Sequence, residues 1–155
     1  MTDRPVIRLR PKAGRRLAAG APWVYSDEVV MDRRARGRAP GTVVTLENAE
    51  RAVLGTAAFN PASTIAARLL DPDAEAEIGA AWLAAKLRDA LALRETFFDA
   101  PFYRLVHAEG DGLPGLVIDR YGDAVAVQPN AAWIDARLDA LVAALDEVIA
   151  PRVVV

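Results

Sequence analysis

The residues around His107 are those whose types suggest proton-transfer chemistry. Arg104, Glu109 and Asp111 all lie within four positions of this single histidine. An imidazole titrates near neutral pH, and a nearby carboxylate orients it or exchanges protons with it. One interpretation is therefore a small-molecule enzyme that uses His107, Asp111 and Arg104. The other is that a lone histidine at a strand end is a structural or surface residue, and we favour this second interpretation.

Residues 110–115, Gly-Asp-Gly-Leu-Pro-Gly, match the glycine pattern of dinucleotide-binding loops. Such a loop binds pyrophosphate when it opens a helix, because the first N–H groups of that helix hold the phosphates. The residues that follow, Leu-Val-Ile-Asp-Arg, predict a strand instead. We therefore interpret the loop as a tight turn between strands, and we expect no cofactor site in it.

The chain has no cysteine and one histidine. These counts exclude disulfides, thiolate metal sites and histidine-rich metal sites, and we assign no catalytic or metal-binding residue. Charges interrupt every apolar stretch well before the roughly 20 residues that a membrane span needs. The first residues lack the apolar run of a secretory signal. We expect a cytoplasmic protein that is not in a membrane.

Positive charge is concentrated near the amino end. Residues 1–38 hold ten basic and four acidic residues, and the rest of the chain holds nine basic and seventeen acidic ones. A basic segment on an acidic protein favours a polyanionic partner, because neutralised phosphates release counterions. The alternative is a solvated loop that binds nothing. We expect one continuous basic surface, and its candidate residues are Lys12, Arg15, Arg16, Gly20, Arg33, Arg34, Arg36 and Arg38.

These basic residues belong to a segment with many short predicted strands. Lys12, Arg15 and Arg16 are predicted on a short helix that ends at Gly20, and residues 33–38 are predicted as a loop. Trp23 is expected in the core. The predicted strands cover residues 5–10, 21–25, 42–46, 52–59 and 64–70, with a hairpin turn at 47–50. This pattern is typical of a small β-barrel, and we place the domain at residues 1–72.

The pattern changes after residue 72. A helix is predicted over residues 75–97, with Glu75 and Glu77 in its first turn, where they favour the helix dipole. Strands at 102–107, 116–120 and 124–128 follow, and then a helix at 133–149. The fold class is therefore α+β, with a mainly antiparallel sheet and two helices in residues 73–155. Residues 152–155 resemble the opening of a further strand, and we expect this domain to be truncated.

Three segments resemble a known family. They are residues 20–29, with Gly-Ala-Pro-Trp-Val-Tyr-Ser; residues 59–68, with Phe-Asn-Pro-Ala-Ser-Thr; and residues 103–123, with Tyr-Arg-Leu-Val-His-Ala-Glu-Gly-Asp-Gly-Leu-Pro-Gly-Leu-Val-Ile-Asp-Arg-Tyr-Gly-Asp. The chain resembles the N-terminal part of the bacterial 23S rRNA large-subunit methyltransferases of the cytosine-C5 type. Ala21 departs from the family, which often has histidine before Pro-Trp.

The resemblance implies an RNA-binding PUA domain, then an α+β connecting domain. It also implies an S-adenosylmethionine-dependent methyltransferase domain that this sequence lacks. Methylation of cytosine C5 usually needs a cysteine thiolate that adds to C6, so this chain alone is expected to be inactive. The expected partner is ribosomal RNA, held for the missing domain. The alternative is a stand-alone RNA-binding adaptor protein.

Overall fold

The computed structural model describes residues 4–155, which divide into two compact units: unit 1 extends to residue 76, and unit 2 covers residues 77–155. The domain boundary predicted between residues 72 and 73 lies close to the division between the units. Unit 1 contains β1 (Val6–Arg8), α1 (Arg15–Ala18), β2 (Trp23–Tyr25), η1 (Ser26–Glu28), α2 (Arg33–Arg36), β3 (Thr42–Glu47), β4 (Val53–Phe59) and β5 (Ile65–Asp71). Unit 2 contains α3 (Ala80–Phe97), β6 (Phe102–His107), η2 (Ala108–Asp111), β7 (Leu116–Tyr121), β8 (Ala124–Pro129), α4 (Ala132–Asp135), α5 (Leu138–Val148) and β9 (Val153–Val154). The fold is α+β, as the sequence predicts.

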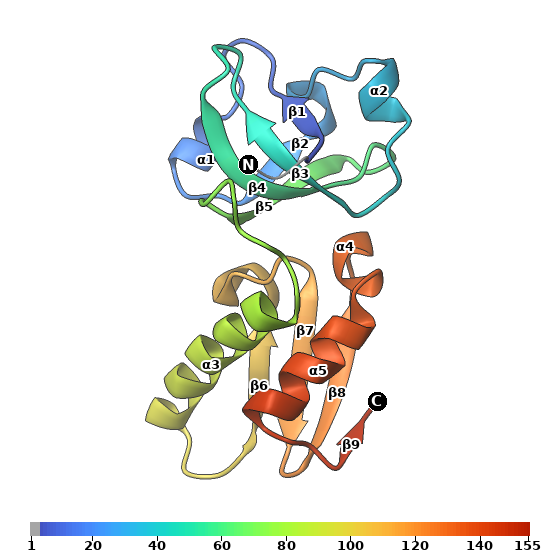
Figure 1. Ribbon diagram of the computed structural model, residues 1–155. Coiled ribbons are helices and arrows are strands. Elements are labelled where there is room, and N and C mark those ends of the chain that lie inside the picture. The colour runs from blue at the N-terminus through green and yellow to red at the C-terminus, as the bar shows by residue number, and fades with distance from the viewer. Residues whose placement is uncertain (1–3) are drawn as a thin grey trace. The chain divides into compact units, whose positions relative to one another are not determined.

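Unit 1 is built on one curled sheet with the strand order β1-β3-β4-β5-β2 (Figure 1). β1 pairs with β3 in parallel, and the other pairs are antiparallel. The segment after β2 reaches the free edge of β1, where Val29 bridges Leu9. Val30 N–H donates to the Arg8 carbonyl at 2.9 Å, and Arg10 N–H donates to the Glu28 carbonyl at 2.8 Å. These bonds curl the sheet towards a barrel.

The core of unit 1 is small and mostly aliphatic. It consists of Ile7, Leu9, Val24, Val29, Ala35, Val44, Leu46, Ala57, Phe59, Ala66 and Ala67. Trp23, which the sequence places in the core, is only half-buried and lies outside this cluster. Phe59 and aliphatic side chains fill this core, and the Trp23 indole is not among them.

Unit 2 has the sheet order β6-β7-β8-β9, in which only β8 and β9 pair in parallel. α3 and α5 lie side by side on one face of the sheet (Figure 1). Leu83 and Leu87 of α3 are fully buried, as are Leu141 and Leu145 of α5. The spacing of four residues places each pair on one side of its helix, as the sequence pattern predicts.

The predicted start of the first long helix is wrong. α3 begins at Ala80 and has no acidic residue in its first turn. Gly79 has extended backbone at the N-cap, and the Asp73 side chain accepts from the Glu75 N–H at 2.9 Å in a preceding turn. Asp and Gly favour such local turns over helix, so Glu75 and Glu77 precede the helix instead of stabilising it.

The predicted single helix at 133–149 is also wrong, because α4 and α5 are separate. The chain leaves helical geometry at Arg137 (φ −132°). The Arg137 side chain donates to the Trp133 carbonyl at 2.8 Å and to the Ile78 carbonyl at 3.2 Å. Partial burial lowers the pKa of Arg137. The guanidinium therefore replaces helical hydrogen bonds at the break, a tertiary contact that hydrophobic periodicity does not reveal.

Candidate nucleic-acid interface

Lys12, Arg15 and Arg16 lie together on an open groove beside α1. The groove, of about 720 Å³, is also lined by Tyr25, Ser26, Asp27, Glu28 and Thr64. We call it the α1 groove. All three cations are exposed, and no ion pair joins any of them to a carboxylate within residues 4–155. No carboxylate of the described residues therefore competes with an external anion for their N–H groups.

Local backbone geometry explains why these cations face outwards. α1 is shorter than predicted, because Lys12 (φ 67°) and Gly14 (φ 84°) have left-handed backbone and the helix begins only at Arg15. A Cβ at Gly14 would lie 3.1 Å from Leu9 Cδ1 in the core. Leu17 packs against the core on the inner side of α1. The turn at Gly14 thus allows α1 to lie close to the barrel while its arginines remain in solvent.

Side-chain contacts of Tyr25 and Glu28 hold the residues of the α1 groove in position. The Arg16 guanidinium carbon lies 4.7 Å from the centre of the Tyr25 ring, within cation–π distance. Glu28 accepts from the Tyr25 N–H at 2.9 Å and from the Gly14 N–H at 3.4 Å. This carboxylate links the end of β2 to the start of α1. It is bonded to the backbone and not to Lys12, Arg15 or Arg16.

Gly20 has a different position from the three cations. Its N–H donates to the Leu17 carbonyl at 2.9 Å, and its φ of 89° ends α1 as predicted. It is exposed, and no atom lies within 4 Å of a Cβ placed there. It does not line the α1 groove.

The second basic cluster is a helix and not the predicted loop. Asp32 caps α2, accepting from the Ala35 N–H at 2.8 Å, and Ala35 is buried in the core. Arg33, Arg34, Arg36 and Arg38 are all exposed. Arg34 and Arg38 line a cleft of about 410 Å³ together with Val6, Ile7, Arg8, Val30, Asp32 and Ala35. We call it the β1–α2 cleft.

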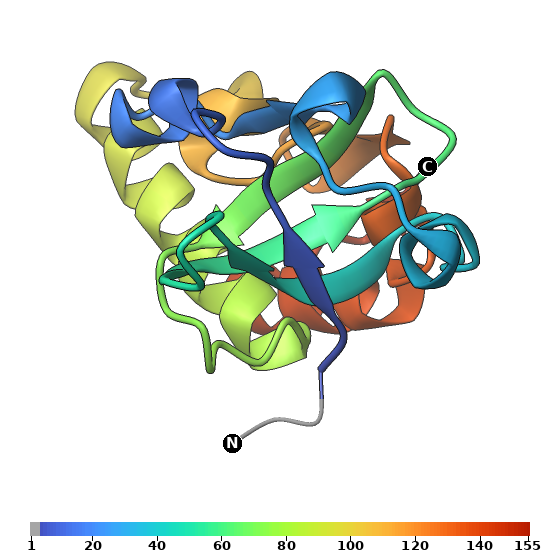
Figure 2. The same cartoon turned by 90° about the horizontal axis from the view of Figure 1, so that it is seen from above.

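The two basic clusters do not form one surface. The α1 groove and the β1–α2 cleft share no lining residue. α1 and α2 lie on opposite sides of unit 1 in both views (Figures 1 and 2). The expectation of a single continuous basic surface is therefore wrong. Arg4 belongs to neither cluster, because it donates to Thr56 Oγ1 and to the carbonyls of Ala74 and Ala76.

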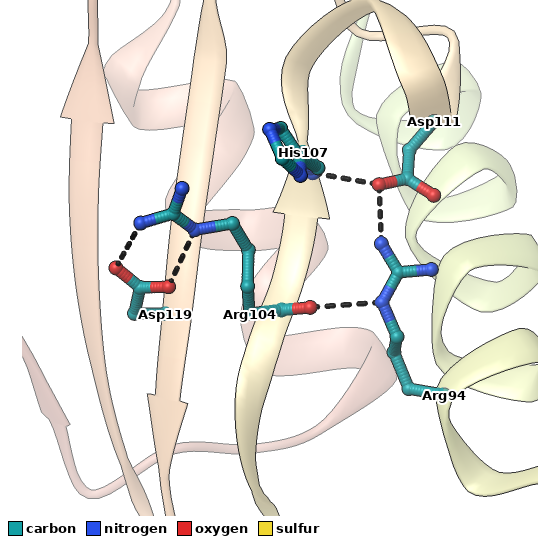
Figure 3. Close-up of polar contacts among 5 residues, drawn as sticks. All are labelled: Arg94, Arg104, His107, Asp111 and Asp119. Carbon is teal, nitrogen blue, oxygen red and sulfur yellow. Dashed lines mark hydrogen bonds and ion pairs between the residues drawn. The ribbon is translucent and has the colours of Figure 1, made fainter. Parts of the chain in front are cut away.

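The polar residues around His107 form a structural brace (Figure 3). Asp111 Oδ2 accepts from Arg94 Nη2 at 2.6 Å and from the His107 backbone N–H at 2.6 Å. Arg94 Nε donates to the Arg104 carbonyl at 2.8 Å. These bonds tie α3, β6 and η2 together. Asp111 is thus already bonded to Arg94 and to the backbone, which does not suit it to proton transfer with the exposed His107 imidazole.

Arg104 and Asp119 form a separate pair on neighbouring strands. Two bonds join them, Nε to Oδ1 at 2.8 Å and Nη2 to Oδ2 at 3.2 Å. The hydrogen bond from Arg104 holds the pKa of Asp119 below its ordinary value, and the same bond raises the pKa of Arg104. A carboxylate held ionised in this way is a poor general acid or base near neutral pH. Neither pair supports the small-molecule enzyme interpretation.

The glycine loop after β6 opens no helix of the kind that binds pyrophosphate. It contains η2 and then passes through Gly112 (φ 68°) and Gly115 (φ 78°) into strand β7. A Cβ at Gly115 would lie 2.6 Å from the Ala131 Cβ, so this glycine is required for packing. Within the described part of the chain, no group of three or more His, Cys, Asp and Glu residues could hold a metal ion, and no helix is long and apolar enough to cross a membrane.

A family model of PUA-like domains matches residues 7–72. This range covers nearly all of the five-stranded sheet and both basic clusters. Residues 7–72 form a PUA-like domain. The α1 groove and the β1–α2 cleft are therefore features of this PUA-like domain.

Relatives match beyond the PUA-like domain. The chain is 32% identical over 139 residues to a ribosomal RNA large subunit methyltransferase of Deinococcus radiodurans, covering 83% of this chain and 34% of the relative. It is 37% identical over 130 residues to ribosomal RNA large subunit methyltransferase I of Aliivibrio fischeri, covering 81% of this chain and 32% of the relative. The chain is homologous to these proteins and spans about a third of their length.

Solved structures share the fold of both units. A Streptococcus mutans protein described as a SAM-dependent methyltransferase superposes with a TM-score of 0.79 at 21% identity. That match covers 95% of this chain and 38% of the other. A methyltransferase structure complexed with SAH gives a TM-score of 0.77, also at 21% identity, and the match covers 95% of this chain and 37% of the other. At this identity the likeness establishes the fold alone.

Two residues of the PUA-like domain were missed by sequence reasoning. Arg8 lines the β1–α2 cleft, but its place there depends on how β1 meets α2 in space. Asp32 caps α2, and a signal for it was present, since Asp directly before a run of helix-favouring residues is a common N-cap.

Proposed function

We propose that this chain is the RNA-binding N-terminal region of a 23S rRNA methyltransferase. The PUA-like domain holds ribosomal RNA at the α1 groove, and unit 2 connects it to a methyltransferase domain outside this sequence. The observation that carries the proposal is the set of three exposed cations, Lys12, Arg15 and Arg16, on one groove, with no carboxylate partner among residues 4–155. Unpaired cations in an open groove suit a phosphate backbone.

The chemistry of methyl transfer belongs to the rest of the longer protein. The glycine loop at residues 110–115 leads into β7 and not into a helix, so it does not fit S-adenosylmethionine. The chain has no cysteine to add to cytosine C6. We therefore assign the cofactor, the C5 specificity and the catalytic residues to the domain outside this sequence. We place the protein in the cytoplasm, where ribosomal RNA is found.

RNA affinity tests the proposal. The wild-type chain and an Arg15→Ala/Arg16→Ala variant would be titrated into a labelled 23S rRNA fragment and followed by fluorescence anisotropy. The matched control is Arg88→Ala/Arg152→Ala, which removes two exposed cations from unit 2. We expect the groove variant to bind at least about tenfold more weakly and the control to bind like the wild type. Equal affinity of all three proteins would refute the proposal.

The alternative is an RNA-binding adaptor without an enzymatic partner domain. The same groove serves both functions, so binding does not separate them. The coding sequence after residue 155 separates the two functions. A cofactor-binding glycine loop and a cysteine downstream support the methyltransferase. A stop codon at that position supports the adaptor.

A further inference from the structure

The β1–α2 cleft has a composition that the α1 groove lacks. It combines three guanidinium groups, from Arg8, Arg34 and Arg38, with aliphatic side chains. We propose that this cleft is a second RNA contact that takes up one unpaired nucleotide, with its phosphate on the arginines and its base against the aliphatic wall. This proposal rests on the proposed RNA-binding function and adds a separate site to it.

Barrel closure creates the cleft. The Val30 N–H donates to the Arg8 carbonyl, and the Asp32 N–H then donates to the Val30 carbonyl at 3.1 Å. The chain therefore turns at once into α2, which Ala35 anchors in the core. α2 is held beside the amino-terminal part of β1, and the space between them stays open. The cleft is thus fixed by backbone bonds and core packing.

The cleft has more cationic donors than it has acceptors. Arg8 makes one ion pair, with Glu47 at 3.1 Å, and its Nε is buried without a hydrogen-bond partner. Arg34 and Arg38 are exposed and make no ion pair with any residue from 4 to 155. The one acid among the lining residues, Asp32, already accepts from the Ala35 N–H. A phosphate matches this imbalance, because guanidinium groups bind its oxygens in pairs.

The aliphatic wall distinguishes a nucleotide from a bare anion. Val6 and Val30 are 49% and 42% exposed, although both flank buried residues of the barrel. A free phosphate would leave these side chains in water, whereas a base would cover them. A base also stacks on the planar face of an arginine. The volume of about 410 Å³ lies in the range of small-molecule sites, roughly 300–1,000 Å³, so it accommodates a single nucleotide.

α2 itself supplies the matched control. Arg34→Ala/Arg38→Ala removes two cations that line the cleft, and Arg33→Ala/Arg36→Ala removes two that do not. All four are exposed, so both variants are expected to fold. For a single-stranded rRNA fragment, we expect the first variant to bind about tenfold more weakly and the second less than about threefold. Equal losses in both variants, or no loss in either, would overturn the cleft as a site.

A small probe tests the nucleotide itself. Methyl resonances of Val6 and Val30 would be followed by NMR while cytidine monophosphate, cytidine or inorganic phosphate is added to the wild-type chain. We expect saturable shifts with cytidine monophosphate, and we expect these shifts to be absent in Arg34→Ala/Arg38→Ala. Cytidine alone and inorganic phosphate alone should give much weaker shifts. Equal responses to inorganic phosphate and to the monophosphate would overturn the base contact.

These results remain separable from the α1 groove. If Arg15→Ala/Arg16→Ala binds RNA like the wild type while Arg34→Ala/Arg38→Ala does not, the groove assignment fails and the cleft stands. If only the groove variant loses affinity, the cleft proposal fails and the proposed function stands. If neither variant loses affinity, both fail.

Discussion

The Arg16 guanidinium lies over the Tyr25 ring, 4.7 Å from its centre, and so joins α1 to the end of β2. The ring limits the positions of a side chain that would otherwise sample many rotamers in solvent. An arginine ordered before binding loses less entropy when it meets a phosphate. We therefore expect the Tyr25 ring to strengthen RNA binding indirectly, by ordering Arg16.

Replacement of Tyr25 tests this coupling. We expect Tyr25→Leu to weaken RNA binding about two- to fivefold, because an exposed cation–π contact contributes about 0.5–1 kcal/mol. Tyr25→Phe keeps the ring face and should bind like the wild type. Anisotropy titrations of both variants make the comparison. A loss in Tyr25→Phe equal to that in Tyr25→Leu would point to the hydroxyl group instead of the ring.

Glu28 is predicted to stabilise the PUA-like domain without contacting RNA. Glu28→Ala removes the acceptor for the Tyr25 and Gly14 N–H groups, and we expect a loss of about 1–3 kcal/mol in the free energy of unfolding. Urea denaturation measures it. Asp27→Ala, an exposed neighbour in the same groove, is the control and should stay within about 0.5 kcal/mol. If Glu28→Ala were as stable as this control, the carboxylate would not be the link between β2 and α1.

Asp111 and His107 are predicted to differ in their effects on stability. The Arg94 and Asp111 side chains are only 14% and 5% exposed, so Asp111→Ala leaves a buried guanidinium without its partner. We expect this variant to lose about 3 kcal/mol. The exposed His107 imidazole has no such role, and His107→Ala should change stability by less than about 0.5 kcal/mol. Thermal and urea unfolding of both variants test the brace, and a large loss in His107→Ala would contradict it.

The titration of Asp119 at acid pH tests its pairing with Arg104. The pKa of Asp119 is lowered below 3.8 in the folded chain, so the pair stabilises the fold above that pH. The contribution is lost as the pH falls through the lowered pKa. In Arg104→Ala the pKa of Asp119 should rise towards 3.8, as followed by NMR titration of its carboxyl carbon. An unchanged pKa in the variant would mean that Arg104 is not the cause.

The strands were the most predictable part of the fold. Runs of β-favouring residues bounded by turns located β3, β6 and β8 to within about one residue. Helix limits were harder, because they depend on contacts remote in sequence. The break at Arg137 needs the carbonyl of Ile78, 59 positions away, and no local pattern contains that information.

The candidate site was predictable in composition and not in arrangement. The sequence identifies Lys12, Arg15 and Arg16 as a cluster, since they fall within five positions. It does not show that Arg8 lies beside Arg34 and Arg38, because that depends on where the barrel closes. Nor does it show that α1 and α2 lie on opposite sides of unit 1 (Figure 2).

The salt dependence of RNA binding tests the central claim most directly, because it reports how many phosphates the protein neutralises. On a single strand, each neutralised phosphate adds about 0.7 to the steepness of log K against log salt. The Arg15→Ala/Arg16→Ala variant should therefore show a slope about 1.4 smaller than the wild type, while Arg88→Ala/Arg152→Ala keeps the wild-type slope. An identical slope in all three proteins would show that the α1 groove does not hold the RNA backbone.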